Sequence, residues 1–152
     1  MTADLVRVGS FGLAPDRSYH PTDHVWARRE GDLVRVGMDD LGQETSGDMA
    51  HIAMRAVGTE VHHGDALGTL EAQKFVGPLR SPLCGTVVAT NAAAANDPRV
   101  VNEDPYGNGW LVLLRPAAHA VIDLAALIPP EAARPWFESE VERFRRQGAL
   151  AE

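Results

Sequence analysis

Short apolar runs alternate with turn-forming polar and glycine residues along most of this chain. In residues 49–57, Met49, Ile52 and Met54 alternate with His51 and Arg55, as expected of a strand with one buried face. The same pattern predicts strands at 25–29, 33–37, 49–57, 86–90 and 110–114. Turn signals recur about every 8 to 12 residues, which is typical of a small antiparallel sandwich or flattened barrel.

The stretch 66–88 has the most informative pattern. An apolar run at 66–70 leads into a polar segment, and a second strand-like run follows Gly85. Two such runs around a short segment predict a hairpin with Lys74 at its tip, pointing into solvent. A lysine on an exposed turn is ordinarily only a solvated side chain, so its flanking residues decide whether it has a role.

The remaining segments predict short helices and loops. Asp39 or Asp40 can cap a short helix that runs through Gln43. Residues 92–95 are alanines and predict one helical turn, whereas 102–109 predict a tight loop. Residues 1–17 contain glycine and proline breakers and are expected to be a loosely held N-terminal segment.

After residue 116 the pattern becomes helical. We expect a helix at 119–128, a stop at Pro129-Pro130 and a second helix at 131–147. Four apolar residues fall on one face of that second helix, namely Trp136, Phe137, Val141 and Phe144. The expected role is a helix that packs on the sandwich, and a helix that binds a partner is the alternative.

Composition bounds the class of protein. The 152 residues suffice for one domain, and 45% apolar with 23% charged residues is ordinary for a globular chain. A net charge of −7 argues against nucleic-acid binding. No apolar run reaches the ~20 residues of a membrane span, and the N-terminus lacks signal-peptide features. A single cysteine, Cys84, is consistent with a reducing cytoplasm.

Three separated blocks of the sequence form a set. The first is Glu71-x-x-Lys74, followed by Ser81-Pro82-x-x-Gly85. The second is 101–111 with its Asn-Glu-Asp-Pro-Tyr-Gly core, and the third is 19–26 with Tyr19, His24 and Trp26. Together these blocks resemble the glycine cleavage H-protein family of lipoyl carriers. The resemblance implies a mainly β, lipoyl-domain-like fold (a barrel-sandwich hybrid) of two small antiparallel sheets with short helices and a C-terminal helix. It divides the chain into an N-terminal segment (1–17), a carrier domain (18–116) and a helical extension (117–152).

The resemblance also implies a cofactor and partners. Lipoate would be joined to Lys74 as an amide, giving an arm of more than about 10 Å whose dithiolane carries the group. Glu71, Gln73 and Phe75 would form the context that a lipoate-protein ligase or lipoyl transferase reads. Such a protein is a carrier on which other enzymes act, because the reactive chemistry belongs to the cofactor.

Two departures affect the expected cargo. H-proteins have acidic residues where this chain has Val25 and Pro78, and a carboxylate there would stabilise a protonated aminomethyl group. Asp23 could substitute if its side chain turned inward. Together with the Gln73-Lys74-Phe75 context and the long tail, these departures resemble the lipoate-binding proteins of the heterodisulfide-reductase-like sulfur oxidation system. We therefore expect a sulfur carrier that serves the heterodisulfide-reductase-like sulfur-oxidising complex.

The alternative is an aminomethyl carrier that serves glycine decarboxylase, aminomethyltransferase and dihydrolipoamide dehydrogenase.

Other chemistry is not indicated by the sequence. No hydrolase, zinc-protease or P-loop motif is present, so a catalytic function of its own is not expected. His62-His63 read as surface histidines rather than metal ligands. Cys84 reads as a buried, inert residue, with thiol exchange against the arm as the alternative. A sandwich that never carries lipoate is a further rival.

Overall fold

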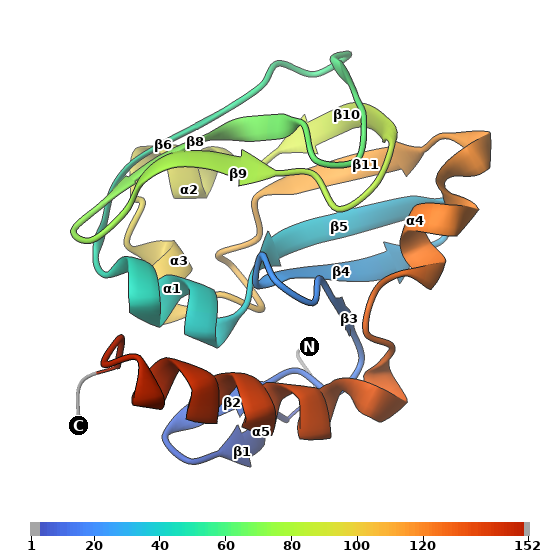
Figure 1. The fold of residues 1–152 in the computed structure, drawn as a ribbon. Coiled ribbons are helices and arrows are strands. Elements are labelled where there is room, and N and C mark those ends of the chain that lie inside the picture. Colours follow the sequence, from blue (N-terminus) through green and yellow to red (C-terminus); the bar gives the residue numbers. More distant parts are fainter. Residues whose placement is uncertain (1–3, 151–152) are drawn as a thin grey trace.

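The computed structural model describes residues 4–150, and its strands form three antiparallel sheets (Figure 1). A six-stranded sheet has the order β3-β4-β5-β11-β10-β7, a three-stranded sheet the order β6-β8-β9, and β1 pairs with β2. The three-stranded sheet lies over the larger one, and a long C-terminal helix lies on the other side (Figure 1). The predicted mainly β fold with short helices and a C-terminal helix is therefore confirmed, with one small sheet more than expected.

The six-stranded sheet contains most of the strands predicted from alternation. In its centre, Val34, Val36, Val87 and Leu114 are fully buried, because successive side chains point to opposite faces and one face packs inward. The strands are β3 (Ser18–Tyr19), β4 (Val25–Glu30), β5 (Leu33–Met38), β7 (Glu60–Val61), β10 (Gly85–Thr90) and β11 (Val112–Pro116).

The three-stranded sheet carries the predicted hairpin, with one correction. Its strands are β6 (Met49–Met54), β8 (Ala66–Ala72) and β9 (Val76–Arg80), and β8 pairs with β9. The run after Gly85 is not the returning strand, because β10 crosses to the six-stranded sheet and pairs with β11. Gly85 permits this close pairing, since a Cβ there would lie 2.6 Å from the carbonyl oxygen of Arg115.

The short helices differ from expectation in two places. The predicted loop at 102–109 begins inside a helix, α3, and the predicted helix at 119–128 is broken and ends early. The early end has a physical reason: Ile128 precedes Pro129 and forms an antiparallel bridge with Tyr19, so the chain is already extended there. The bounds are α1 (Asp40–Ser46), α2 (Ala92–Asn96), α3 (Val100–Glu103), η1 (Ala118–Ala120) and α4 (Val121–Ala125).

The N-terminal segment is more ordered than predicted. β1 (Val6–Val8) and β2 (Phe11–Leu13) form a hairpin whose turn uses Gly9 at φ 62°. The glycine that was interpreted as a breaker thus makes the turn. The side chains of β2 are buried, which fixes the segment on the domain. The first three residues of the predicted 1–17 segment lie outside the described residues.

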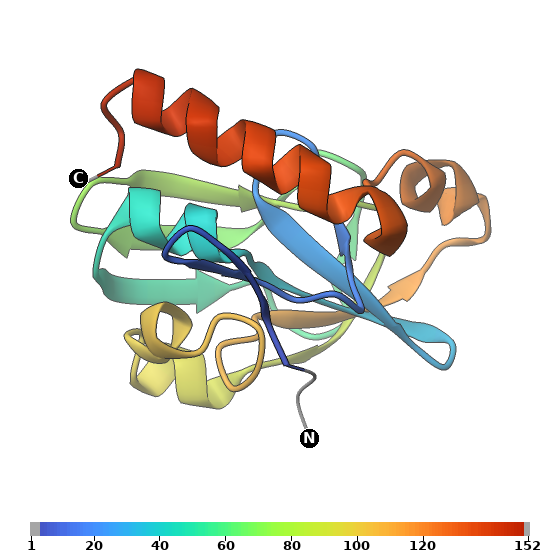
Figure 2. The same ribbon diagram turned by 90° about the horizontal axis from the view of Figure 1, so that it is seen from below.

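The C-terminal helix α5 (Pro130–Arg146) is confirmed almost as predicted. It crosses the domain beside α1 and the β1–β2 hairpin (Figure 2). Phe137 and Val141 are buried, and Trp136 and Phe144 are partly buried against the same cluster. This cluster also holds Trp26, so the helix shares a core with the sheet. Among the described residues, no helix is long and apolar enough to cross a membrane.

Candidate functional site

Lys74 lies at the tip of the β8–β9 hairpin, as predicted. The turn is closed by the backbone N–H of Ala72, which donates to the carbonyl of Phe75 (2.8 Å). The tip is also bonded to the end of α1 and the loop that follows it: the Lys74 N–H donates to the Ser46 carbonyl (2.8 Å) and the Gln73 N–H to the Asp48 carbonyl (3.0 Å). The backbone of the tip is therefore held on both sides.

Gly47 and Asn102 support the tip from below. Gly47 has φ 81°, and a Cβ there would lie 3.0 Å from the Cβ of Gln73. The Asn102 amide donates to the Gly47 carbonyl (2.9 Å), and its oxygen accepts from Met49 N–H (2.9 Å). The asparagine of the downstream block thus fixes the loop on which the lysine hairpin rests.

The side chains around Lys74 face solvent. Lys74, Glu71, Gln73 and Phe75 are all exposed, and within the described part of the chain Lys74 has no ion pair. Lys74 is also the only lysine in the whole sequence, since all the other residues among the 14 lysines and arginines are arginine. The tip therefore offers one accessible ε-amine to a modifying enzyme.

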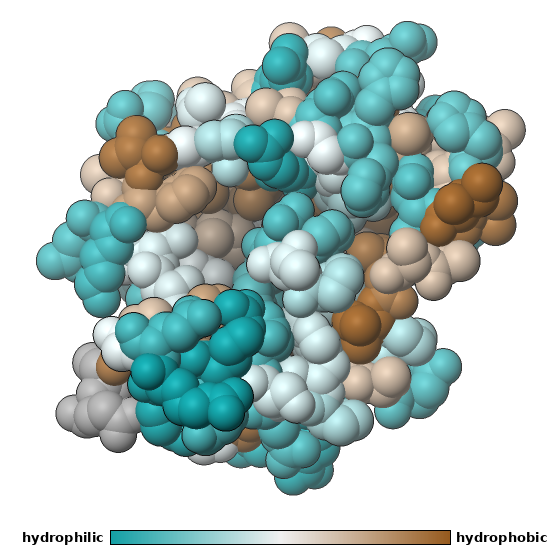
Figure 3. Space-filling model, in the orientation of Figure 1, coloured by the Kyte–Doolittle hydropathy of each residue, from teal (hydrophilic) through white to brown (hydrophobic). Residues whose placement is uncertain are grey.

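A cleft of about 350 Å³ opens beside this hairpin. In Figure 3 it is the hollow between the hairpin sheet and the hydrophilic surface of α5. Its walls come from the turn before β4, from α1, from β8 and β9, and from α5. The lining residues are Thr22, Asp23, His24, Val25, Met38, Gly42, Thr45, Ser46, Leu70, Phe75, Pro78, Leu79, Arg80 and Phe144.

The charges at the cleft bear on the cargo. Val25 and Pro78 stand on its wall and supply no carboxylate, as the sequence indicated. Asp23 does line the cleft, with its side chain 36% exposed. Arg80 lines it as well, and its guanidinium donates to the Gly64 carbonyl (3.0 Å). One anion and one cation thus border the same space.

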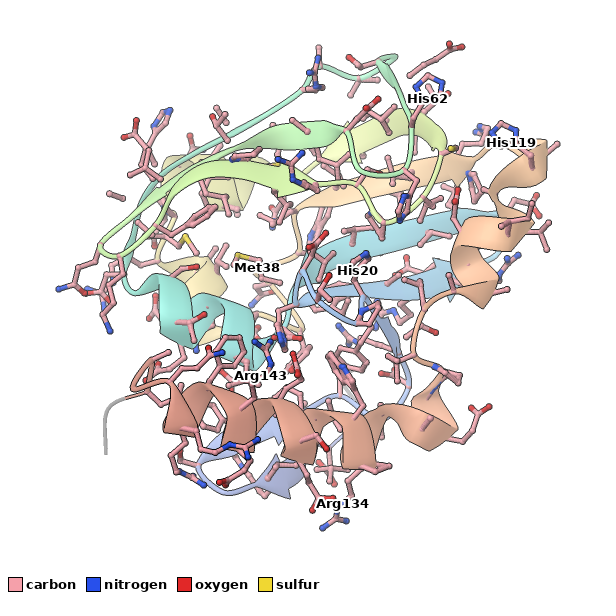
Figure 4. All side chains as sticks on the ribbon, viewed as in Figure 1. His20, Met38, His62, His119, Arg134 and Arg143 are labelled. Atoms are coloured by element: carbon pink, nitrogen blue, oxygen red, sulfur yellow. The ribbon has the colours of Figure 1, made fainter. Side chains whose placement is uncertain are left out.

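His24 forms a buried ionic network under the cleft. Its Nδ1 lies 2.8 Å from Asp39 Oδ2 and its Nε2 2.8 Å from Glu140 Oε1. Arg143, labelled in Figure 4, donates to the same Glu140 carboxylate (2.8 Å). The ring also stacks on Trp136 at 5.3 Å. The network joins the start of β4 to α5, so His24 holds the helix whose Phe144 lines the cleft.

This network predicts a pH dependence of stability. Burial alone would lower the pKa of His24, but the nearby Asp39 and Glu140 carboxylates raise it above its ordinary value. A raised folded-state pKa stabilises the protein fully below about pH 6.5, and this contribution is lost as pH rises through the folded-state pKa. We expect the free energy of unfolding to fall as the pH rises over that range. The fall is ~1.4 kcal/mol for each factor of ten by which the folded state binds the His24 proton more tightly than the unfolded state does.

The matched variant is His24→Asn. His24 has φ 55°, a left-handed conformation that asparagine tolerates, so the backbone should be retained. Urea unfolding between pH 6 and pH 9 should give a shallower decline for this variant than for the wild type. Parallel declines would mean that His24 does not titrate within this network.

Cys84 and His62 lie away from the hairpin tip. Cys84 is half-buried and shares a separate small pocket with His62 and His119. Those two histidines lie at the opposite end of the molecule from the hairpin tip (Figures 1 and 4). This position argues against thiol exchange with an arm at Lys74. Among residues 4–150 no cluster of metal-ligating side chains is found.

Sequence reasoning missed part of the cleft. Arg80 and Thr45 gave no signal, since nothing local distinguishes them from surface residues. Phe144 was read only as part of a core-facing stripe, although it also lines the cleft. The uniqueness of Lys74 was a signal in the sequence that would have strengthened the site assignment.

Comparison with known proteins identifies close relatives. The glycine cleavage H-protein family matches residues 17–138. The glycine cleavage system H protein of Magnetococcus marinus is 37% identical over 125 residues, which cover 82% of this chain and 88% of that protein. The Thermus thermophilus H protein is 38% identical over 128 residues, covering 84% and 98%. A crystal structure of the Mycobacterium marinum H protein matches with a TM-score of 0.72 and 33% identity, covering 84% of this chain and 98% of that one.

Proposed function

Because this chain belongs to the glycine cleavage H-protein family, whose members are non-catalytic lipoyl carriers, we propose that it carries lipoate on Lys74 and shuttles an aminomethyl group. The observation that carries this proposal is the exposed Lys74 beside a cleft bordered by Asp23. The relatives reported above bear the glycine cleavage name, which favours the aminomethyl cargo over the sulfur cargo suggested by local sequence features.

The residues around Lys74 suit a lipoyl amide. The ε-amine has no competing ion pair among the described residues, and the tip is held by three backbone hydrogen bonds. When bound, the lipoyl group supplies a disulfide that opens on two-electron reduction, so that a sulfur can carry the cargo. The rigid hairpin sets the origin of the arm, and partner enzymes then act at its far end.

The cleft residues would shelter the cargo between encounters. Leu70, Leu79 and Phe144 supply apolar walls that limit access of water. Asp23 supplies a carboxylate that stabilises a protonated amine by a charge-assisted hydrogen bond. Asp23 thereby takes the role that Val25 and Pro78 leave vacant.

The proposal implies a set of partners. A lipoate-protein ligase or lipoyl transferase attaches the cofactor, reading the exposed Glu71, Gln73 and Phe75. Glycine decarboxylase, aminomethyltransferase and dihydrolipoamide dehydrogenase then act on the arm in turn. We propose that these encounters take place in the cytoplasm.

A second candidate cargo has its own support. Val25 and Pro78 leave these two positions of the cleft wall without a carboxylate, and Arg80 lines the cleft. A cation is suited to an anionic sulfur group and unfavourable for a protonated amine. These features support a carrier for a heterodisulfide-reductase-like sulfur-oxidising complex.

A loading assay separates the two cargoes. The lipoylated protein in its disulfide form is offered glycine and glycine decarboxylase, and in its dithiol form it is offered inorganic polysulfide. Intact mass then identifies the adduct. We expect an aminomethyl adduct, retained about fivefold longer by the wild type than by Asp23→Asn, as for a partly exposed charge pair. A sulfur adduct without any aminomethyl adduct would contradict the proposal and support the second candidate.

A further inference from the structure

The turn that carries Asp23 is organised around the imidazole of His20. The His20 Nδ1 atom lies 3.2 Å from the backbone nitrogen of Thr22 and 3.0 Å from that of Asp23. Both backbone groups are donors, so Nδ1 must be the acceptor and the ring must be neutral. The side chain closes the turn as an asparagine does in an Asx turn.

The same imidazole faces the carboxylate at the cleft. His20 Nδ1 lies 3.6 Å from Asp23 Oδ2, and the hydroxyl of Thr22 lies 3.4 Å from Asp23 Oδ1. Among residues 4–150 no lysine or arginine forms an ion pair with Asp23. His20 thus contacts both the backbone and the carboxylate of Asp23. Figure 4 labels His20 and, on the cleft wall, Met38.

From this geometry we infer that His20 is a positioning residue that holds Asp23 in the cleft and keeps its charge free for a cationic cargo. The inference rests on the proposed function, because it concerns the aminomethyl group, and it names a residue that acts only through Asp23. The neutral ring accepts the two backbone N–H groups and leaves the carboxylate unpaired. The protonated ring would lose both bonds and pair with Asp23 instead.

The surroundings of His20 favour the neutral form. Burial lowers the pKa of His20, and the neighbouring His63 and His24 lower it further, whereas Asp23 opposes them. His63, in the loop between β7 and β8, stacks on the His20 ring at 6.0 Å. From α5, the uncharged Trp136 donates to the carbonyl of Pro21 (3.3 Å) in the same turn. The groups that face His20 therefore keep it neutral until the pH falls.

Two variants separate capping from titration. His20→Asn supplies an amide oxygen that can accept the same N–H groups and does not titrate, whereas His20→Ala removes the acceptor. His62→Asn is the matched control, because His62 is an exposed histidine whose Nδ1 lies 3.3 Å from Asp65 Oδ2 and which does not line the cleft. The unmodified chain gives the first test: the Thr22 and Asp23 amide NMR shifts should follow the titration of His20 in the wild type and in His62→Asn, and lose that dependence in His20→Asn.

The loaded protein gives the second test. The half-life of the aminomethyl adduct should fall at low pH in the wild type and in His62→Asn, and in His20→Asn this fall should begin at a lower pH. At neutral pH the half-life of the adduct on His20→Ala should be about fivefold shorter than on the wild type. Equal retention by wild type and His20→Ala, with amide shifts that ignore His20, would overturn the inference while leaving the carrier function intact. Amide shifts that follow His20 in a protein that takes up no aminomethyl group would overturn the cargo instead.

Discussion

Replacing Lys74 with arginine is expected to abolish lipoylation while leaving the fold unchanged. Arginine retains the positive charge but has no ε-amine to form the amide. The side chain is exposed and unpaired among the described residues, so the free energy of unfolding should change by no more than about 0.5 kcal/mol. Intact mass after incubation with a lipoate-protein ligase, lipoate and ATP measures the first effect, and urea unfolding measures the second.

The hairpin position can be tested by moving the lysine. The double variant Lys74→Arg/Arg80→Lys keeps the composition and transfers the only lysine to the end of β9. We expect no lipoylation of this variant, because residue 80 lies away from the held turn. Lipoylation of the double variant at residue 80 would show that the modifying enzyme does not require the lysine to lie at the hairpin tip.

Replacing Phe137 with alanine is expected to cost about 3–5 kcal/mol of stability, as for other buried aromatic residues. Phe137 is fully buried in the cluster that α5 shares with Tyr19 and Trp26. Its loss would loosen α5, and with it Phe144 on the cleft wall. The measurement is the free energy of unfolding from urea denaturation at pH 7.

The control for Phe137 is Ile122→Ala. Ile122 is 74% exposed on α4, so its truncation should change stability by no more than about 0.5 kcal/mol. A comparably small effect of Phe137→Ala would mean that α5 is not part of the cooperative core, and would favour the alternative of a partner-binding helix.

Local patterns in the sequence predicted the elements well where burial follows a simple period. The alternation of β5 and the stripe of α5 are examples, because each element buries one face. Lys74 was found through its flanking motif, and the turn chemistry around it placed it at a tip. The prediction that the run after Gly85 is the second strand of the hairpin was wrong, because residues 81–84 carry the chain to another sheet. A local hydrophobic pattern does not indicate to which sheet a strand belongs.

Long-range contacts were beyond local reasoning. His24 and Glu140 are 116 positions apart, and their bond depends on how α5 docks. The support of the tip by Asn102 through Gly47 spans 55 positions, and nothing in either segment indicates the other. The role of His20 was equally hidden, because it depends on the direction of one imidazole nitrogen within a turn.

The most direct test of the account is peptide mapping of the wild-type chain after lipoylation. Trypsin cleaves after unmodified lysine but not after an acylated one, and the flanking cleavage points are Arg55 and Arg80. The account predicts an uncut peptide of residues 56–80 that carries the mass of one lipoyl group on Lys74. Complete cleavage after Lys74, with no lipoyl mass on the protein, would contradict it.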